Sequence, residues 1–312
     1  MIKTVTITNK QTYEQIEIGA KAPFVLDSID WGSASVEQTS YRVPFQIGEF
    51  KTGEVVGIRQ ISIVGYVVAD DVTGVGKSWK QYYEDCEKKI EENKLLLDKL
   101  FSIYYNVSIE TGEYRIEGVP TTAVKYSTNE EDNNEVFCMF SVVLKCFNPM
   151  FVKGGMKQTQ LATTSGKLHF PLIIKHGGVV FGEIIKRRSV PILNSGDSDA
   201  GCVITIFADG GIVKDPKIYI IQTEEFLEFK DVTLQPGDYI TVTTETGKEN
   251  AIWHDASETK EINVIGHLTN DSKFIKIKKG TYDYAYSVDE QYMSNVDVKI
   301  EFEEQYFNIR GM

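Results

Sequence analysis

The stretch SWKQYYEDCEKKIEENKLLLDKLF, residues 78–101, differs in pattern from the rest of the chain and decides how its fold is interpreted. Apolar side chains recur in it at spacings of three and four, and charged residues fill the positions between them. This period is typical of an amphipathic helix with one face on a core, and Ser78 is a suitable N-cap. We therefore predict one long helix here. The residues on its predicted core face are Trp79, Tyr82, Tyr83, Cys86, Ile90, Leu97 and Leu100.

Strand patterns lie on both sides of this helix. Residues 58–68 before it are rich in β-branched side chains and are bounded by loop residues. Residues 135–147 after it alternate with a period of two, which places every second side chain on one face of a strand. A strand of this length is expected at the centre of its sheet, and Asn148-Pro149 ends it. Shorter strands are predicted at 3–8, 14–18, 24–29 and 41–45.

Two further stretches complete the first half of the chain. Residues 113–117 and 121–126 are predicted to pair as a β-hairpin around 118–120. Residues 152–167 are rich in Gly, Thr and Gln and are interpreted as a linker. The first domain is therefore predicted to be a β domain with one long α-helix and a β-hairpin.

The length of 312 residues is large for a single core, so we predict two domains, 1–152 and 153–312. From about His169 onward the sequence indicates short strands and turns only. This pattern is typical of an antiparallel β-sandwich or barrel, and the chain as a whole is predicted to be mainly β. The clearest of these strands are 217–221, 239–243, 274–277 and 296–302.

Composition excludes several functions. The formal charge of −12 argues against binding a nucleic-acid backbone, because such binding needs a cluster of Lys and Arg, and the best cluster is only Lys186-Arg187-Arg188. No apolar run reaches the roughly 20 residues that span a bilayer. The N-terminal residues lack the apolar core of a signal peptide, which predicts folding in a cytoplasm. The four cysteines form no CxxC pair and are predicted to be buried thiols.

The motif GVGKS, residues 74–78, follows a strand and opens a helix, as a phosphate-binding loop does. However, Asp71 stands where that motif needs its first glycine, so we interpret the motif as a turn with a helix cap. The four histidines His169, His176, His254 and His267 lack metal-ligand spacing, and no GxSxG elbow is present. We therefore predict no catalytic, cofactor-binding or metal-binding residues.

Three groups of residues, taken in order along the chain, resemble a known family. They are GIRQISIVG at 57–65; EYRIEG at 113–118 followed by FSVVLKCFNPMF at 140–151; and LQPGDYITV at 234–242 followed by TGK at 246–248 and FIKIKKG at 274–280. Their order, with one helix after the first, resembles the distal tail protein family of bacteriophages that infect Gram-positive bacteria.

The resemblance implies a structural virion component. It implies a homo-hexameric ring of first domains that joins the tail tube protein to the tail hub, tail-associated lysin or baseplate, with DNA passing through without specific binding. It also implies that the second domain is a galectin-like β-sandwich that docks receptor-binding proteins. The expected location is the virion tail, assembled in the host bacterial cytoplasm without a membrane. An acidic lumen that weakens the sticking of DNA is a further hypothesis.

Exposed strand edges need partners, and the hairpin predicted at 113–126 carries aromatic and β-branched residues on both arms. We predict a subunit interface there. Its candidate residues are Tyr114, Ile116, Val124 and Tyr126. Two alternatives stay open: a carbohydrate-binding or adhesin-type β-sandwich module using an aromatic platform such as Trp253, or an enzyme, either a nucleotide hydrolase at Gly74–Ser78 or a glycosidase.

Overall fold

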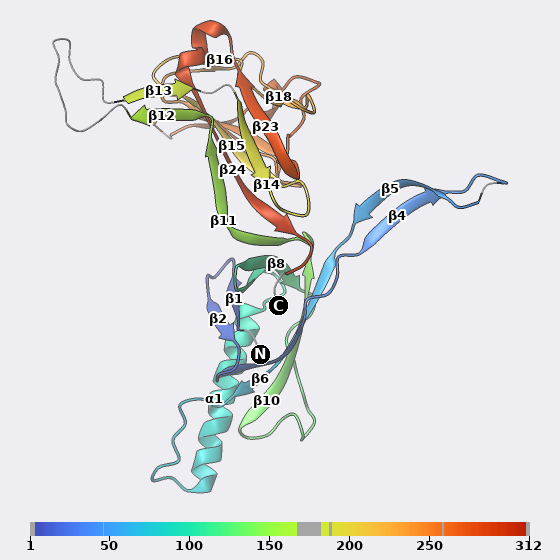
Figure 1. Cartoon of the computed structure of the whole chain (residues 1–312). Helices are drawn as coiled ribbons and strands as arrows, with labels where there is room; N and C mark the ends of the chain where they lie inside the picture. The colour runs from blue at the N-terminus through green and yellow to red at the C-terminus, as the bar shows by residue number, and fades with distance from the viewer. Residues whose placement is uncertain (1–3, 46, 167–181, 187–188, 258, 310–312) are drawn as a thin grey trace. The chain divides into compact units, whose positions relative to one another are not determined.

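The computed structural model describes residues 4–45, 47–166, 182–186, 189–257 and 259–309. The chain divides into two compact units, which we call unit 1 (Met1–Lys153 with Tyr306–Met312) and unit 2 (Gly154–Gln305) (Figure 1). His169, His176 and the Arg187-Arg188 part of the basic cluster lie outside the described residues. The mainly β fold with one long helix is confirmed.

Unit 2 is inserted in the sequence of unit 1. The chain leaves unit 1 after Lys153 and returns to it at Tyr306. The domains predicted at 1–152 and 153–312 differ from these units in placing residues 306–309 in the second domain. The linker predicted at 152–167 is wrong, because strands β11 (Phe151–Gln160) and β12 (Ala162–Gly166) occupy most of it. Pairing with other strands outweighs the weak strand preference of its Gly and Gln residues.

Unit 1 contains two runs of antiparallel strands, and each run combines strands from before and after the long helix. One run has the order β2 (Gln15–Ile18), β1 (Val5–Asn9), β7 (Val107–Thr111), β8 (Tyr114–Pro120) and the first residues of β11. A second has the order β3 (Phe24–Asp30), β6 (Arg59–Val68) and β10 (Phe137–Cys146), with β9 (Lys125–Tyr126) beside β10. Alternate side chains of β6 and β10 are buried, as the period of two predicts.

The hairpin predicted between 113–117 and 121–126 is wrong. Strand β8 continues through 118–120, the predicted turn, and pairs with β7 through a turn at Gly112, whose φ is +58°. Strand β9 pairs instead with β10, with Tyr126 opposite Phe140. The turn at Gly112 requires a left-handed backbone, which glycine adopts without a steric penalty.

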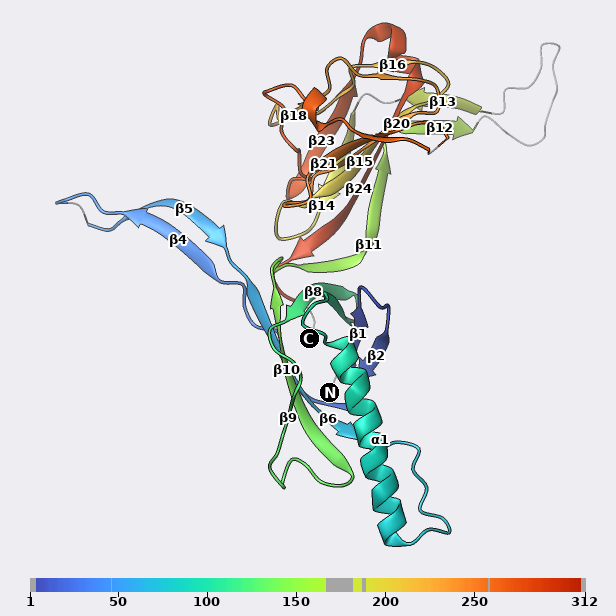
Figure 2. The same ribbon diagram turned by 180° about the vertical axis from the view of Figure 1, so that it is seen from behind.

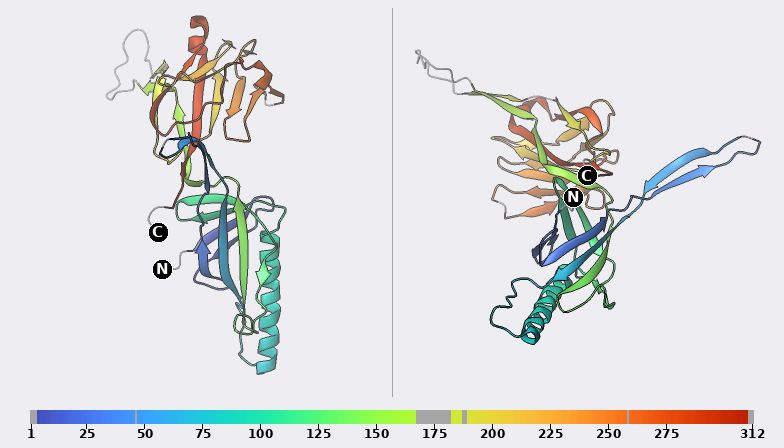
Figure 3. Two further views of the ribbon diagram at one scale, coloured as in Figure 1. Left: turned by 90° about the vertical axis from the view of Figure 1, so that its right-hand side faces the viewer. Right: turned by 60° about the horizontal axis from the view of Figure 1, so that its bottom comes forward.

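The helix α1 (Trp79–Leu100) begins and ends within one residue of its predicted bounds. It packs along β6 (Figure 3). The buried Asn93 side chain donates to Asp70 Oδ1, just after β6, at 3.1 Å. Its buried apolar residues are Cys86, Ile90, Leu97 and Leu100. The placement of Trp79 in the core is wrong, because its side chain is 77% exposed. The first turns of α1 extend past the strands that cover the rest of the helix (Figure 2).

Ser78 is the N-cap of α1, as predicted, and forms a capping box with Gln81. We expect Ser78→Ala to lower the free energy of unfolding by about 1 kcal/mol, because the Gln81 N–H loses its acceptor. Ser78→Asp keeps an acceptor and adds a negative charge to a first turn without acidic residues, so it should match the wild type. Chemical denaturation followed by circular dichroism measures both; equal stability of the alanine variant would contradict this role.

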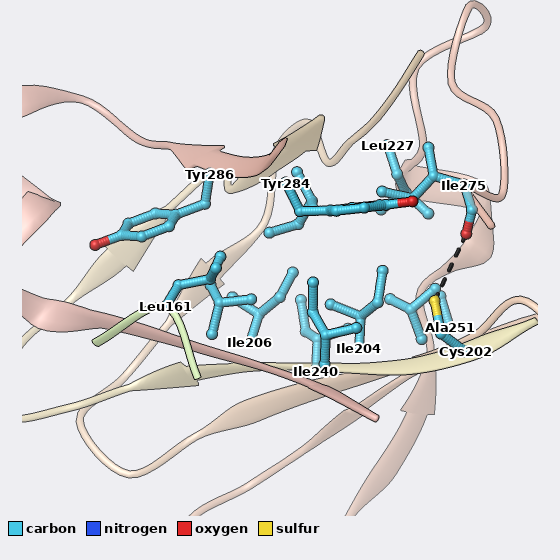
Figure 4. Close-up of a cluster of buried hydrophobic side chains, with 14 of the residues drawn as sticks. Leu161, Cys202, Ile204, Ile206, Leu227, Ile240, Ala251, Ile275, Tyr284 and Tyr286 are labelled. Atoms are coloured by element: carbon cyan, nitrogen blue, oxygen red, sulfur yellow. Dashed lines mark hydrogen bonds between the residues drawn. The ribbon is translucent and has the colours of Figure 1, made fainter. Parts of the chain in front are cut away.

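Unit 2 is an antiparallel β-sandwich. One sheet has the order β24 (Val296–Tyr306), β15 (Cys202–Ala208), β20 (Tyr239–Thr243), β21 (Asn250–His254) and β22 (Glu261–Asn263), and the other has β14 (Ser189–Asn194), β23 (Gly280–Ser287), β17 (Lys217–Ile220) and β18 (Phe226–Glu228). Figure 4 shows Ile204, Ile206 and Ile240 on one side of the core and Tyr284 and Leu227 on the other. The predicted C-terminal sandwich is confirmed.

Candidate functional site

A two-stranded ribbon projects from unit 1, and we call it the arm. It consists of β4 (Val36–Tyr41) and β5 (Phe50–Val56), joined by residues 42–49 (Figure 1). Within the part of the chain that the structure describes, these strands pair only with each other. An isolated two-stranded hairpin is marginally stable in water, so the arm needs a surface to lie on.

The side chains of the arm fit such a surface. Every residue of β4 is exposed, and so is every residue of β5 except the partly buried Gly53. Phe45 and Ile47 at the tip are fully exposed, and Tyr41 stacks on Phe50 at a centroid distance of 5.5 Å. Single exposed apolar residues are normal on a protein surface, but several gathered at the tip of a projecting element are typical of an interaction site. The other large apolar residues exposed on β4 and β5 are Val36, Val55 and Val56.

The chain enters and leaves the arm at a rigid root. The Gly57 N–H donates to Ser35 O at 2.7 Å, so the two ends of the arm are held together. At Gly32 the backbone has φ +57°, and a Cβ atom there would lie 2.0 Å from Gln60 O. Glycine is therefore required at this position both by conformation and by space.

Arg59 is the centre of this root and is only 1% exposed. Its guanidinium donates to the carbonyl oxygens of Trp31 (3.0 Å), Gly32 (2.8 Å) and Pro149 (2.8 Å), and also to that of Phe307. It also lies 4.6 Å from the centroid of the Phe151 ring. These contacts join the start of the arm to the segments before the chain leaves unit 1 and after it returns.

No carboxylate contacts Arg59 in the residues described, so carbonyl dipoles and the Phe151 ring compensate its charge. Burial lowers the pKa of Arg59, and the nearby Cys146 opposes that shift. Because the ordinary pKa of arginine is above 12, the group stays protonated at neutral pH. Burial also raises the pKa of the Cys146 thiol to about 11, which keeps it neutral and unreactive.

The predicted interface residues lie mostly inside unit 1. Tyr114, Ile116 and Val124 are buried, and the Tyr114 ring meets Tyr306 edge-on at 6.1 Å. Tyr126 is partly buried and donates to Lys94 O or Asp98 Oδ1 of α1, at 3.1 and 3.0 Å. Burial and Asp98 raise its pKa. Whether neighbouring subunits meet at β8 and β9 stays a prediction. The buried side chains would then hold these strands in position and would not contact the neighbouring subunit themselves.

The polar side chains of the GVGKS motif have partners within the protein. The Lys77 ammonium forms an ion pair with Asp85, and the Ser78 hydroxyl caps α1. Asp71, at the position where the phosphate motif needs glycine, has a left-handed backbone with φ +55°. Both polar side chains that nucleotide binding would need are engaged within the protein.

Other candidate groups are integrated into the fold. Trp31 and Trp253, considered as sugar-stacking platforms, are partly buried and pack against the cores of units 1 and 2 respectively. Among the described residues, no three His, Cys, Asp or Glu side chains are arranged to hold a metal ion. None of the helices in the described ranges combines the length and hydropathy required to cross a membrane.

The arm and Arg59 were not identified from the sequence, although Arg59 has a signal. It occupies the same face of β6 as Ile61, Ile63 and Val67, all of which are buried. When a charged residue occupies one of the alternate positions whose other members are apolar and buried, its charge is expected to be buried too and to need several partners. The arm has no comparable signal, because its strands have no buried face that would produce an alternating pattern. The strand predicted at 41–45 is wrong, since the ribbon turns after Tyr41.

Comparison with known proteins identifies solved structures with a similar fold. No protein-family model and no curated protein matches the chain. It is similar to the crystal structure of the Dit protein of phage SPP1, described as a paradigm of the hub adsorption apparatus in phages infecting Gram-positive bacteria. The two are 12% identical over 96% of this chain and 98% of that one, with a TM-score of 0.59. A chain of the phage P2 baseplate in its activated conformation with Ca is 10% identical over 97% of this chain and 98% of its own, with a TM-score of 0.50.

The chain therefore has the fold of phage tail hub and baseplate proteins. The resemblance to the distal tail protein family is confirmed at the level of the fold, and it extends over both units.

Proposed function

We propose that this protein is a structural, non-catalytic component of a phage tail, namely a distal tail protein that assembles as a homo-hexameric ring. The observation that carries the proposal is the arm, an exposed ribbon with apolar residues at its tip and base and without a partner in the described chain, on a fold shared with SPP1 Dit. A head-to-tail contact between two different surfaces of one protein generates a ring when the rotation closes. The arm of one subunit and a surface of its neighbour supply such a pair.

In this proposal unit 1 forms the ring, in the virion tail, between the tail tube protein and the hub or baseplate. DNA passes through the channel without specific binding, and the net charge of −12 would weaken its adhesion if acidic residues line the lumen. Unit 2 carries surfaces for other tail components, including receptor-binding proteins. Assembly in the host cytoplasm agrees with the four free, buried cysteines.

The shape of the assembled protein tests this proposal. We expect the purified full chain at high concentration, or isolated tails that contain it, to show six-fold rings with a central channel by electron microscopy. Native mass spectrometry should give six copies of the 35.2 kDa chain. A chain that stays monomeric at high concentration and occurs in no ring within tails would contradict the proposed function.

A further inference from the structure

Unit 2 contains an open pocket of about 390 Å³ beside the hairpin of β17 and β18. Strands β17 and β23 and the turn at 221–225 contribute to it. The residues that line it are Lys217, Tyr219, Ile220, Ile221, Glu224, Phe226 and Ser287. Cavities of about 300–1,000 Å³ are the usual size for small-molecule sites. Neither the arm nor the root at Arg59 includes any of these residues.

Three polar side chains in this pocket have unused hydrogen-bonding capacity. Tyr219, Ser287 and Glu224 line it, and none of their side chains forms a hydrogen bond or ion pair among the described residues. Together they offer hydroxyl donors and several acceptor oxygens. A ligand that carries several hydroxyl groups would satisfy them.

The charges of the pocket disfavour an anion. The one cation, Lys217, lies 3.5 Å from Glu228 and 3.9 Å from the centroid of the Phe226 ring, so it already has partners. Glu224 adds a negative charge without a cation of its own. A phosphate or carboxylate would therefore be repelled, whereas an uncharged polyol would not.

The remaining wall is apolar. Tyr219 and Phe226 lie directly opposite each other on β17 and β18 and are partly exposed, and Ile221 beside them is 47% exposed. Such a wall beside a few fixed polar groups suits a pyranose, which has an apolar C–H surface and a rim of hydroxyls.

Backbone strain lies at the same place. Glu224 has a left-handed backbone with φ +57°, held by its N–H donating to Ile220 O at 3.0 Å. Glycine would adopt this conformation more readily, so glutamate lowers stability here relative to glycine. A carboxylate kept at a strained position on the rim of a pocket is consistent with a role in binding.

We propose that this pocket binds an uncharged pyranose, with Glu224, Tyr219 and Ser287 contacting its hydroxyls and Phe226 and Ile221 contacting its C–H surface. The pocket belongs to unit 2 and does not depend on ring formation. If no sugar binds here, the proposed tail role still stands. If no ring forms, the proposed sugar site still stands.

Saturation-transfer NMR on the full chain tests the site, with methyl α-glucopyranoside, methyl β-galactopyranoside and N-acetylglucosamine as probes and glycerol phosphate as the anionic comparator. We expect saturable binding of at least one sugar and none of glycerol phosphate. Glu224→Gly removes the carboxylate while relieving the backbone, so it should weaken binding about tenfold without loss of folding.

Asp231→Gly is the matched control. Asp231 is also an exposed acid with a left-handed backbone, φ +59°, but it does not line the pocket. This variant should bind the sugar as the wild type does. The proposal is overturned if no sugar of the panel binds, if glycerol phosphate binds instead, or if Glu224→Gly binds as tightly as Asp231→Gly.

Discussion

Replacing Arg59 with methionine is expected to lower the free energy of unfolding of unit 1 by about 3–5 kcal/mol. The substitution removes the Arg59 donors from four part-buried carbonyl oxygens, on Trp31, Gly32, Pro149 and Phe307. Hydrogen bonds to a charged group contribute about 1.5–3 kcal/mol each, and part of this is offset because the charge no longer has to be desolvated. The total is a large fraction of the stability of a typical domain.

The measurement is equilibrium denaturation of the full chain, followed by tryptophan fluorescence. Trp31 and Trp79 lie in unit 1 and Trp253 in unit 2, so Trp253→Phe isolates the signal of unit 1. Arg59→Lys should also be destabilising, because an ammonium cannot match the planar fork that reaches several carbonyls at once.

Arg42→Met provides a matched control at an exposed position of the arm. It should change the free energy of unfolding by no more than about 0.5 kcal/mol. If Arg59→Met unfolded at the same denaturant concentration as Arg42→Met, the guanidinium would not be what holds the root together.

Removing the arm is expected to abolish ring assembly while unit 1 still folds. Residues 36–56 can be replaced by a short Gly-Ser turn, because Ser35 O and Gly57 N are only 2.7 Å apart. The removed residues bury little within the chain, so the stability of unit 1 should stay close to that of the wild type. The exposed apolar surface that the ring would cover is lost with them.

Size-exclusion chromatography with light scattering at several protein concentrations measures this effect. A second variant, Phe45→Ser with Ile47→Ser, keeps the ribbon and removes only the two fully exposed apolar side chains of its tip. We expect it to weaken assembly, and Lys51→Ser on the same arm to have little effect. Rings formed by the chain without its arm would show that another surface joins the subunits.

The regular elements of this protein could be predicted because their periods are strong. The helix at 79–100 and the strands at 59–68 and 137–146 follow patterns that local chemistry imposes. Trp79 was misplaced because helical period alone does not say how far the covering sheet extends. The strand at 151–160 has no such local pattern, because the partners that stabilise it are remote in sequence.

The candidate site could not be predicted for the same reason. Arg59 binds carbonyls on residues 31, 32, 149 and 307, a set that only the fold assembles. The arm is an element whose side chains stay exposed in the single chain, so it lacks the buried face on which strand prediction depends. The pocket beside Glu224 depends on a left-handed residue that is not a glycine, which no turn pattern indicates.

The return of the chain to unit 1 at Tyr306 has a consequence for biosynthesis. Ribosomes build proteins from the N-terminus, so residues 1–153 emerge long before Phe307, whose carbonyl Arg59 needs. The core of unit 2 includes Val296, Val298, Ile300 and Phe302 of β24, so both units are completed only once residues 296–307 have emerged. A chain that stops before Phe307 therefore never completes its Arg59 root.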